Sequence, residues 1–334
     1  MTIAANAAAA RQLTLDELRN GERFVLVTHE HPDGDALGSL VAMHGVLVAL
    51  GKDAVMFMSD ADLPVPDEYR FLDFGDIVST VPADLDERVV VFLDCGNIDR
   101  NPVDVVKRDG SHIVNIDHHH DNTRFGDVDL VVPEASCTAE IVWDLMNELE
   151  IPPTLQIAEA LYVGLVTDTG QFMYENTGPR AHAMAASLIE AGVDVHGIYR
   201  RLYEGTPPAK VALLGRALSG MRRYDDGRLT MTRITRDDFE LAGADDSHSE
   251  GVVDHLRAVR GTKVAALVRE RAAEPSEEPQ AKVSLRASDG DVDVSIIARA
   301  GGGGGHRQAA GFTTTLGADE LVAFLRREIG AQLR

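Results

Sequence analysis

Four short apolar runs in the first part of the chain constrain its fold more than any other feature. They are rich in β-branched residues and lie at 23–28, 54–58, 88–93 and 112–116. Runs of this length predict buried strands, and a helical pattern at 36–50, ended by Gly51, separates the first two. Strands that alternate with helices predict an α/β fold with a parallel sheet covered by helices on both faces.

The helical pattern dominates from about 135 to 205, and the chain then breaks at Glu204-Gly205-Thr206-Pro207-Pro208. We therefore expect a first domain at 1–205 and a smaller α/β domain at 206–334.

The pattern of the second half predicts two helices and three strands, at 209–221 and 318–329 for the helices and near 228–234, 263–269 and 281–286 for the strands. The polar segment 271–279, which contains two prolines, predicts an exposed hairpin loop. The alanine-rich segment 1–10 lacks a basic start, so we expect a frayed lead-in rather than a signal peptide.

The composition argues against several classes of protein. The hydrophobic fraction is 44%, and no apolar run is long enough for a membrane span, so we expect no membrane partner. The net charge is −22 and aromatic residues make up 5%, which disfavours a grip on long nucleic acid. Cys95 and Cys137 are the only cysteines, so we expect no disulfide framework and a cytoplasmic location.

A dense polar cluster, His29-Glu30-His31-Pro32-Asp33-Gly34-Asp35, follows the first predicted strand. Carboxylate and imidazole ligands together suit divalent Mn, Fe, Co or Zn, and the bends at Pro32 and Gly34 let positions 29, 33 and 35 converge. The alternative is a turn in which Asp35 caps the following helix. Glu30 and His31 are expected at the loop surface or behind the ligands.

Polar residues also close three later apolar runs. Asp94 ends the third strand, Asp117-His118-His119-His120 follows the fourth, and Asp168 closes the run 161–167. Each could be a turn or capping residue taken alone. Because ligands bind at the carboxyl ends of strands in a parallel sheet, one shared site accounts for all of them together.

The three consecutive histidines are expected to have different roles, because the side chains of adjacent residues on an extended segment point in opposite directions. We predict that His118 binds metal, that His119 faces the substrate, and that His120 lies on the surface. Asp117 suits the acceptor that orients a histidine. Cys95 is expected to be a small buried residue rather than a soft ligand.

Five consecutive glycines lie in the second half, within Arg299-Ala300-Gly301-Gly302-Gly303-Gly304-Gly305-His306-Arg307. Glycines let backbone N–H groups approach a phosphate or nucleobase closely. No Gly-Lys-Ser/Thr follows, and His306 stands where a dinucleotide fingerprint needs glycine. A flexible linker is the alternative, but the strand pattern after His306 favours a binding loop. Arg286 suits a bidentate phosphate clamp, or is a surface arginine.

From about Phe24 to the C-terminus, the ordered motifs resemble the DHH phosphoesterase superfamily, most closely its two-domain nanoRNase/pAp-phosphatase branch. The motifs are His29-x-His31-Pro32-Asp33-Gly34-Asp35, Asp94, Asp117-His118-His119, Gly164-Leu165-x-Thr167-Asp168-Thr169-Gly170, Glu250-Gly251-Val252-Val253-Asp254, Ser284-Leu285-Arg286, Asp293-Val294-Ser295 and the glycine run with His306. The sequence departs from the family at His31, where many relatives carry asparagine, and in having five glycines where four are expected.

The resemblance implies a catalytic DHH domain followed by a DHH-associated nucleotide-binding domain. It implies two Mn²⁺ ions, or Mg²⁺ or Co²⁺ in their place. The implied metal ligands are His29 and Asp33 for one ion, Asp35, His118 and Asp168 for the other, and Asp94 between them. The implied catalytic residues are His119, which contacts the scissile phosphate, Asp117 and Asp94, and the implied substrate-binding residues are Arg286, Gly303, Gly304 and His306.

The activity that the resemblance implies is hydrolysis of short oligonucleotides, of 3′-phosphoadenosine 5′-phosphate, or of both, by a two-metal-activated water in a homodimer. A cyclic-di-AMP or linear-dinucleotide phosphodiesterase is the alternative that the same residues allow. A non-catalytic nucleotide-binding regulator is less favoured, because every expected ligand is present. A pyrophosphatase is disfavoured because the glycine loop indicates that a nucleoside is held.

Overall fold

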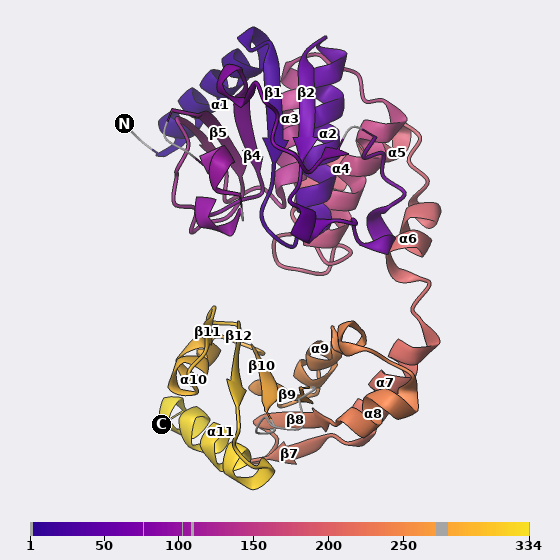
Figure 1. Ribbon diagram of the computed structural model, residues 1–334, viewed down its shortest axis with the longest axis vertical. Coiled ribbons are helices and arrows are strands. Elements are labelled where there is room, and N and C mark those ends of the chain that lie inside the picture. The colour runs from indigo at the N-terminus through magenta and orange to yellow at the C-terminus, as the bar shows by residue number, and fades with distance from the viewer. Residues whose placement is uncertain (1–2, 76, 102, 108–109, 272–279, 334) are drawn as a thin grey trace. The chain divides into compact units, whose positions relative to one another are not determined.

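The chain forms two compact units, residues 1–205 and 206–334, each with its own hydrophobic core (Figure 1). The computed structural model describes residues 3–75, 77–101, 103–107, 110–271 and 280–333. Most of the expected hairpin loop at 271–279 lies outside these described residues.

The first unit is built on a parallel six-stranded sheet with the strand order β3-β2-β1-β4-β5-β6. The strands are β1 (Arg23–Val27), β2 (Asp53–Phe57), β3 (Ile77–Val78), β4 (Val89–Leu93), β5 (His112–Asp117) and β6 (Val128–Val131). The four expected strands and their parallel arrangement are confirmed. The sequence pattern missed β3, which has only two residues, and β6, in which Asp129 interrupts a four-residue strand.

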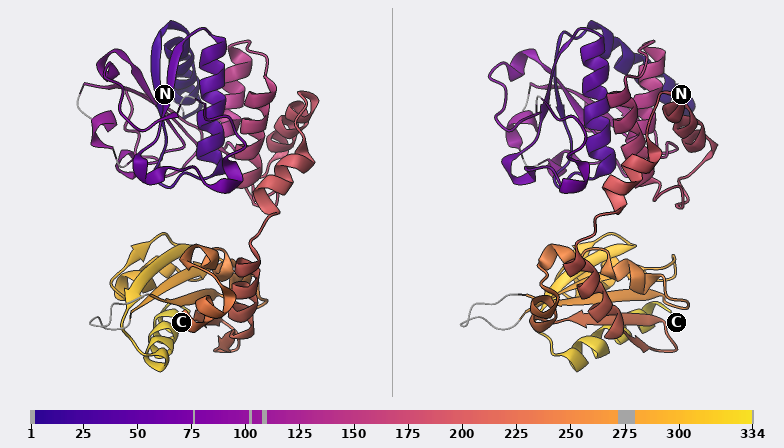
Figure 2. Two further views of the ribbon diagram at one scale, coloured as in Figure 1. Left: turned by 45° about the vertical axis from the view of Figure 1, so that its right-hand side comes forward. Right: turned by 90° about the vertical axis from the view of Figure 1, so that its right-hand side faces the viewer.

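One face of this sheet carries a layer of long helices, with α2 and α4 side by side (Figures 1 and 2). The helices of the unit are α1 (Ile3–Asn20), α2 (Gly34–Ala49), α3 (Thr138–Glu148), α4 (Leu155–Asp168), α5 (Pro179–Glu190) and α6 (Val195–Tyr203). On the opposite face, Val25, Val90 and Phe92 pack with Leu85 and Val106. The α/β class is therefore confirmed, and the covering helices of this second face are short 3₁₀ turns, η3 (Leu85–Glu87) and η5 (Asp104–Lys107).

The expectation of a frayed start was wrong for residues 3–10, which form the first half of α1. Alanine has the highest helix propensity of all residues, so an alanine-rich segment continues a helix readily. The second half of α1 anchors the helix, because Leu15 and Leu18 are buried in the core.

The second unit contains a mixed six-stranded sheet with the order β11-β12-β10-β9-β8-β7, antiparallel except for the β8–β9 pair. Its strands are β7 (Arg222–Tyr224), β8 (Leu229–Ile234), β9 (Val264–Glu270), β10 (Ala281–Ala287), β11 (Gly304–Gly305) and β12 (Ala309–Thr314). Its helices are α7 (Pro208–Ser219), α8 (Arg236–Ala242), α9 (Val252–Arg257), α10 (Val294–Ala300) and α11 (Ala318–Gln332).

Side chains alternate along β10 between the two faces of this sheet. Val283 and Leu285 lie in the core with residues of α10 and α11. Lys282, Ser284 and Arg286 face the other side, where α9 and the 3₁₀ turn η6 (Asp246–Ser249) pack beside β9. Lys282 is exposed and the other two are half-buried, so this face is open to solvent over β10.

A search of the described residues for a helix long and apolar enough to cross a membrane finds none.

Candidate metal centre

The candidate site lies where the strand order of the first sheet reverses, between β1 and β4. In open parallel sheets, ligands bind outside the carboxyl ends of the strands at such a switch point. His29 follows β1 by two residues, Asp94 follows β4 directly, and Asp117 is the last residue of β5. The three polar clusters found in the sequence therefore meet at one edge.

Asp94 occupies the centre of the site and is only 2% exposed. Its Oδ2 lies 3.7 Å from Nε2 of His29, and its Oδ1 lies 3.6 Å from Nε2 of His118. The backbone of Asp94 has φ +59°, a left-handed conformation that residues other than glycine rarely adopt. Strained conformations of this kind cluster at functional sites, and here the strain turns the carboxylate toward the histidines.

The two aspartates of the first motif have different roles at the start of α2. Asp33, not Asp35, is the N-cap: its Oδ1 accepts hydrogen bonds from the backbone N–H groups of Asp35 and Ala36, each at 3.1 Å. The alternative in which Asp35 caps the helix was therefore wrong, because α2 begins at Gly34. Asp35 is the second residue of the helix, and its carboxylate is free for other partners.

Those partners are at the N-terminus of α3. The backbone N–H groups of Thr138 and Ala139 donate to the two carboxylate oxygens of Asp35, at 2.7 and 2.9 Å. A helix N-terminus favours negative charge, so α3 stabilises the buried Asp35 carboxylate and fixes its orientation. Gly164 of α4 makes room for it, because a Cβ at this position would lie 2.8 Å from Oδ1 of Asp35.

His118 joins Asp35 to Asp168, the last residue of α4. Nε2 of His118 lies 4.0 Å from Oδ2 of Asp35 and 3.7 Å from Oδ2 of Asp168. The same oxygen of Asp168 accepts a hydrogen bond from the Asn176 side chain at 3.1 Å. The expected ligand Asp168 therefore reaches the site from a helix end, not from a strand.

His119 also faces the site, and the expectation that it would point away from His118 was wrong. The two ring centroids lie 4.8 Å apart, and Nδ1 of His119 lies 3.7 Å from Oδ1 of Asp94. The alternation of an extended strand does not apply, because β5 ends at Asp117. Asp117 orients His119 through a 2.8 Å hydrogen bond at Nδ1, while His120 is exposed.

The carboxylates of the site differ in pKa because their surroundings differ. Burial, followed by the negative charge of Asp94, raises the pKa of Asp35 well above its ordinary value. Burial also raises the pKa of Asp168, to about 6. Burial acts on Asp94 in the same direction, but the three surrounding histidines outweigh it and lower the pKa of Asp94 to about 2. Asp35 is thus the carboxylate whose charge most needs a cation beside it.

The hydrogen bond to Asp117 raises the pKa of His119 to about 9, against the effect of burial. Burial alone would lower the pKa of His29, but the contacts with Asp94 and the Glu30 carbonyl oxygen raise it. Nδ1 of His29 lies 2.7 Å from that carbonyl oxygen. In the tautomer in which Nδ1 donates to the carbonyl, Nε2 has a free lone pair directed toward Asp94, as a metal-binding histidine requires.

The donor atoms fit a divalent cation. Three overlapping groups have donor atoms within 4.8 Å of one another, namely His29 with Asp33 and Asp94, Asp35 with His118 and Asp168, and Asp94 with His118 and His119. Oxygen and imidazole donors in this mixture suit Mn²⁺, Fe²⁺, Co²⁺ or Zn²⁺. The buried carboxylates of Asp35 and Asp94 lie close to each other and to Asp168, so their negative charges repel, and a cation between them would remove that repulsion.

Sequence reasoning missed two residues that hold the ligands in place. The Thr138 hydroxyl donates to Oδ1 of Asp94 at 3.0 Å, and Asn176 donates to Asp168. The signal for Thr138 was the segment Ser136-Cys137-Thr138-Ala139-Glu140 before an amphipathic helix, which is typical of a helix N-terminus. We find no sequence signal for Asn176, because its contact depends on the turn after α4.

The neighbours of the ligands lie at or near their expected places. Cys95 is buried, its thiol donates to the Asn97 carbonyl oxygen at 3.1 Å, and burial raises its pKa to about 12. Glu30 and His31 are exposed, and the backbone N–H of His31 donates to Asp62 at 2.8 Å. None of the three belongs to the donor groups found among the described residues.

The expected substrate-binding residues all lie in the second unit. Arg286 is half-buried on β10, with its Nε 3.9 Å from Oδ1 of Asp254. Gly303 lies so close to the Gly311 carbonyl oxygen that no Cβ would fit, whereas Gly304 is exposed with open space beside it. His306 is exposed in the turn between β11 and β12, and its backbone N–H donates to the Ala309 carbonyl oxygen at 2.8 Å.

These substrate-binding candidates share one sheet. Gly304 of β11 pairs with Gly311 of β12, which pairs with Ser284 of β10, two residues before Arg286. The glycine run is therefore not a free linker: its last two residues form the edge strand of the sheet that carries Arg286.

Comparisons with known proteins agree with this architecture. Residues 23–165 match the DHH family, N-terminal domain, and residues 239–331 match the DHHA1 domain. The chain is 36% identical over 292 residues to the bifunctional oligoribonuclease and PAP phosphatase NrnA of Thermus thermophilus, covering 86% of this chain and 83% of that one.

Two solved structures share the fold. An exopolyphosphatase-related protein from Bacteroides fragilis aligns with a TM-score of 0.83 and 25% identity over 97% of this chain and 96% of that one. The exonuclease RecJ bound to manganese aligns with a TM-score of 0.55 and 16% identity over 98% and 94%, which indicates a common fold alone.

Proposed function

The chain belongs to the DHH family, and we propose that it is a metal-dependent phosphoesterase that hydrolyses short oligonucleotides and 3′-phosphoadenosine 5′-phosphate. The observation that carries the proposal is the position of Asp94 between two groups of donor atoms at the switch point of the sheet. The 36% identity to a bifunctional oligoribonuclease and PAP phosphatase supports the choice of substrates.

We assign two divalent cations to the site, with Mn²⁺ as the preferred ion and Mg²⁺ or Co²⁺ as substitutes. His29, Asp33 and Asp94 would hold one cation. Asp35, His118 and Asp168 would hold the other, with Asp94 also within reach of it. The close donor groups support this division, because each set contains both carboxylate and imidazole donors.

Cations in this position supply Lewis-acid activation of the phosphate ester and of water. The side chains and backbone of the protein orient the catalytic histidine and the metal ligands. Asp117 holds Nδ1 of His119, which leaves Nε2 to donate to an oxygen of the scissile phosphate. Thr138 and the N-terminus of α3 hold Asp94 and Asp35 in place before substrate binds.

The second unit supplies the contacts to the nucleotide. Arg286 offers a planar guanidinium for a phosphate, and the open space at Gly304 lets a nucleotide approach the backbone closely. His306 is exposed beside them. We also propose a homodimer, from the family resemblance, and a cytoplasmic location, from the two unpaired buried cysteines.

A substrate panel tests the proposal. The enzyme with Mn²⁺ is offered a 5′-phosphorylated dinucleotide, 3′-phosphoadenosine 5′-phosphate and cyclic-di-AMP, and release of mononucleotide or phosphate is measured. Asp94→Ala should lose more activity than the roughly 10–100-fold that loss of a partner behind a ligand costs. Asp60→Ala, which removes an exposed carboxylate of the same unit, should retain it.

The possible outcomes separate the candidates. No turnover of any phosphate ester by folded enzyme with Mn²⁺ contradicts the proposal, and tight nucleotide binding without turnover favours a regulator. Faster turnover of cyclic-di-AMP than of the linear substrates reassigns the enzyme as a cyclic-dinucleotide phosphodiesterase. Retained activity in Asp94→Ala contradicts the shared-ligand role.

A further inference from the structure

Three tyrosines of the first unit gather beside the candidate metal centre. Tyr174 follows the expected ligand Asp168 by six residues, and 55% of its surface is exposed. Tyr199 and Tyr203 lie on α6, with their ring centroids 5.1 Å apart. The proposed function gives none of the three a role. Because aromatic residues make up only 5% of the chain, their concentration in one place calls for an explanation.

The turn after α4 holds Tyr174 close to Asp168. The backbone N–H of Tyr174 donates to the Thr169 carbonyl oxygen at 3.0 Å. The Tyr174 ring lies directly against Gly170, where an added Cβ would overlap it. The side chain of Asn176, two residues further on, donates to the Asp168 carboxylate at 3.1 Å. Contacts on both sides of Tyr174 therefore fix its ring near the metal centre.

The backbone of this turn is strained. Gln171 and Phe172 are consecutive residues with φ +62° and +65°, in the left-handed region that residues other than glycine rarely adopt. Such strain persists only where the surrounding structure holds it, and it clusters at functional sites. The Phe172 ring packs against the core and stacks on His182, with centroids 5.1 Å apart, whereas Tyr174 is exposed. The strained turn thus directs one aromatic ring inward and the other toward solvent.

Tyr203 connects Tyr174 to Tyr199. Burial, followed by the neighbouring hydroxyl groups of Tyr199 and Tyr174, raises the pKa of Tyr203 to about 12, so Tyr203 lies near both. Tyr203 is half-buried between them, and Tyr199 is 42% exposed. The three rings therefore form one tyrosine surface, which begins beside the metal centre and continues onto α6.

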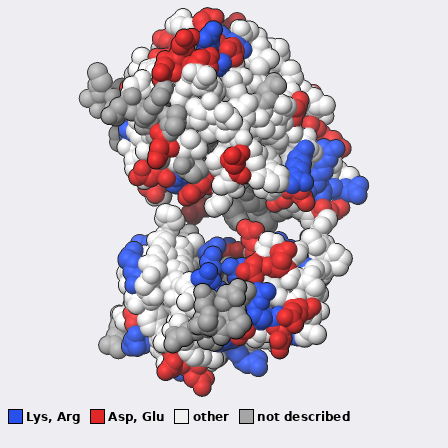
Figure 3. Space-filling model, viewed as in Figure 1, with Lys and Arg blue, Asp and Glu red and all other residues white. Residues whose placement is uncertain are grey.

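The chemistry of the tyrosine surface suits a nucleobase. A lone exposed tyrosine needs no explanation, but a patch of neighbouring rings indicates a binding surface. Aromatic side chains stack on the π-face that every base has. Basic side chains gather over α6 on the face seen in Figure 3, and Arg201 of its last turn forms no ion pair with the described residues. Stacking rings beside positive charge match a base that carries a phosphate.

We propose that Tyr174, Tyr199 and Tyr203 stack against the base of the nucleotide next to the scissile phosphate. This inference rests on the proposed function and extends it. The tyrosines and the candidate metal centre belong to the same unit, so the contact needs nothing from the second unit. The enzyme should then require a base at this position but accept any of the four, because stacking does not read the edge of the base.

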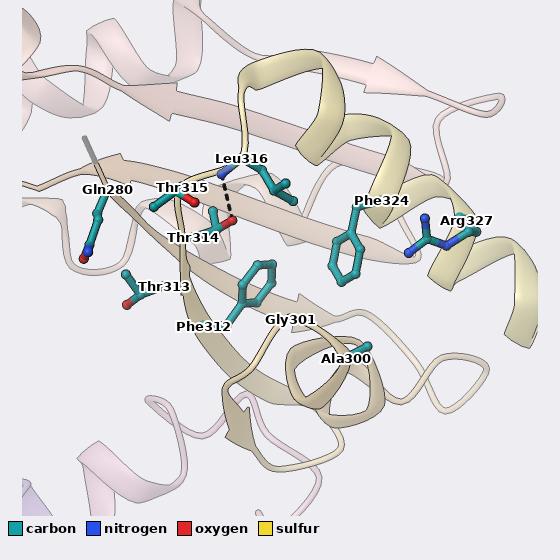
Figure 4. Close-up of a pocket in the computed structure, with 10 residues that line it drawn as sticks. All are labelled: Gln280, Ala300, Gly301, Phe312, Thr313, Thr314, Thr315, Leu316, Phe324 and Arg327. Atoms are coloured by element: carbon teal, nitrogen blue, oxygen red, sulfur yellow. Dashed lines mark hydrogen bonds between the residues drawn. The ribbon is translucent and has the colours of Figure 1, made fainter. Parts of the chain in front are cut away.

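An aromatic ring of the second unit provides the control. Phe324 lines a pocket of about 550 Å³ between β12 and α11 (Figure 4). Its ring packs edge-to-face on Phe312, with centroids 5.7 Å apart, and the Arg327 guanidinium lies 5.3 Å from its centroid. Phe324 therefore already has two partners, whereas no cation of the described residues lies over the Tyr174 ring.

The test compares pApA with two analogues in which one base or the other is replaced by hydrogen, in the presence of Mn²⁺. Removal of the stacked base should lower kcat/KM of the wild type roughly 10–100-fold, the size of one base–aromatic contact. Tyr174→Leu should lose a similar factor with pApA and should no longer distinguish pApA from that analogue. Tyr174→Phe keeps the ring and should behave as the wild type. Phe324→Leu, which removes a ring in the second unit, should keep the wild-type preference.

A spectroscopic measurement separates this inference from the proposed function. The base analogue 2-aminopurine loses fluorescence when it stacks on an aromatic ring, so dinucleotides that carry it at either position report stacking with EDTA in place of metal. Quenching that is lost in Tyr174→Leu and kept in Tyr174→Phe supports the stacking site, even if no dinucleotide is hydrolysed and the proposed function fails. Equal quenching in the wild type and Tyr174→Leu, or an equal penalty for each missing base, overturns the inference.

Sedimentation of the same variants tests the competing occupant of the tyrosine surface, a second copy of the chain. A smaller assembly in Tyr174→Leu than in the wild type would make the tyrosines a subunit contact and contradict the stacking role. Tyr174 is mostly exposed, so its leucine variant should keep the melting temperature of the wild type. If Tyr174→Leu unfolds, Tyr199→Leu on α6 provides the same measurements.

Discussion

Asp94 combines three properties that a ligand shared by two cations needs. It is buried, its carboxylate lies between His29 and His118, and its pKa is lowered to about 2 by the surrounding histidines. The left-handed backbone at this residue costs free energy of order 1–3 kcal/mol, which the surrounding contacts must offset. The Thr138 hydroxyl is one of these contacts.

Thr138→Val should weaken metal binding by about 10–100-fold, because the substitution removes the hydroxyl that fixes Asp94 and keeps the shape of the side chain. The measurement is the Mn²⁺ concentration at half-maximal activity, together with the melting temperature of the metal-free protein. A purely structural role for Thr138 would lower the melting temperature without changing the Mn²⁺ dependence.

Thr14→Val is the matched control for this substitution. Thr14 is a fully buried threonine of the same unit, and its hydroxyl donates to the Ala10 carbonyl oxygen within α1. The control should leave the Mn²⁺ dependence unchanged. Equal Mn²⁺ dependence in Thr138→Val and Thr14→Val would contradict a role for Thr138 in positioning Asp94.

At the scale of the secondary-structure elements, the ends of helices contribute to the site together with the ends of strands. Asp33 caps α2, the N-terminus of α3 holds Asp35, and the C-terminal residue of α4 is Asp168. A sequence pattern locates a helix but not the residue that its first N–H groups bind. The partner of Asp35 is Thr138, 103 residues later in the chain, so only the tertiary structure could identify it.

The glycine run leads to a prediction for two neighbouring residues, Gly303 and Gly304, the second of which begins β11. A Cβ at Gly303 would overlap the Gly311 carbonyl oxygen and Phe312, so Gly303→Ala should lower the free energy of unfolding by about 1–3 kcal/mol. Gly304 has open space beside it, so Gly304→Ala should change stability by no more than about 0.5 kcal/mol. Thermal or denaturant unfolding of the two variants checks both values.

The Gly304→Ala variant should still bind nucleotide less tightly than the wild type, because its methyl group fills the space that the proposed function gives to the nucleotide. Calorimetry with a dinucleotide measures this. Unchanged affinity in Gly304→Ala would place the nucleotide elsewhere, and equal stability of the two variants would contradict the packing at Gly303.

At the scale of the whole molecule, charged side chains occur in both units, whereas the groups of metal-donor atoms found in the described residues occur in one. Acidic and basic side chains both occur on the face seen in Figure 3, and over the whole sequence the acidic residues outnumber the basic ones to give a net charge of −22. All three groups of donor atoms found in the described residues belong to the first unit. Metal binding should therefore stabilise residues 1–205 selectively.

Added Mn²⁺ should slow amide hydrogen exchange at the ends of β4 and β5 and at the starts of α2 and α3. At 100 times its Kd, an ion that binds only the folded state adds about 2.7 kcal/mol to the free energy of unfolding. Exchange in residues 206–334 should not change with metal alone, and EDTA should reverse the effect in the first unit. Slower exchange confined to the second unit would contradict the assignment of the metal centre.

The sequence by itself determined the α/β class, the main strands and which residue types gather after them. These follow from local rules, since apolar runs form buried strands and the carboxyl ends of parallel strands share an edge. That information was enough to predict that His29, Asp94 and Asp117 lie at one edge of the parallel sheet.

The tertiary structure decided how the side chains at that edge divide their contacts. It made Asp33 the helix cap, turned His118 and His119 to the same side, and brought Thr138 and Asn176 to the ligands. The physical reason is that local periodicity ends where a strand or helix ends. Beyond that point, contacts between segments far apart in the chain set the direction of each side chain.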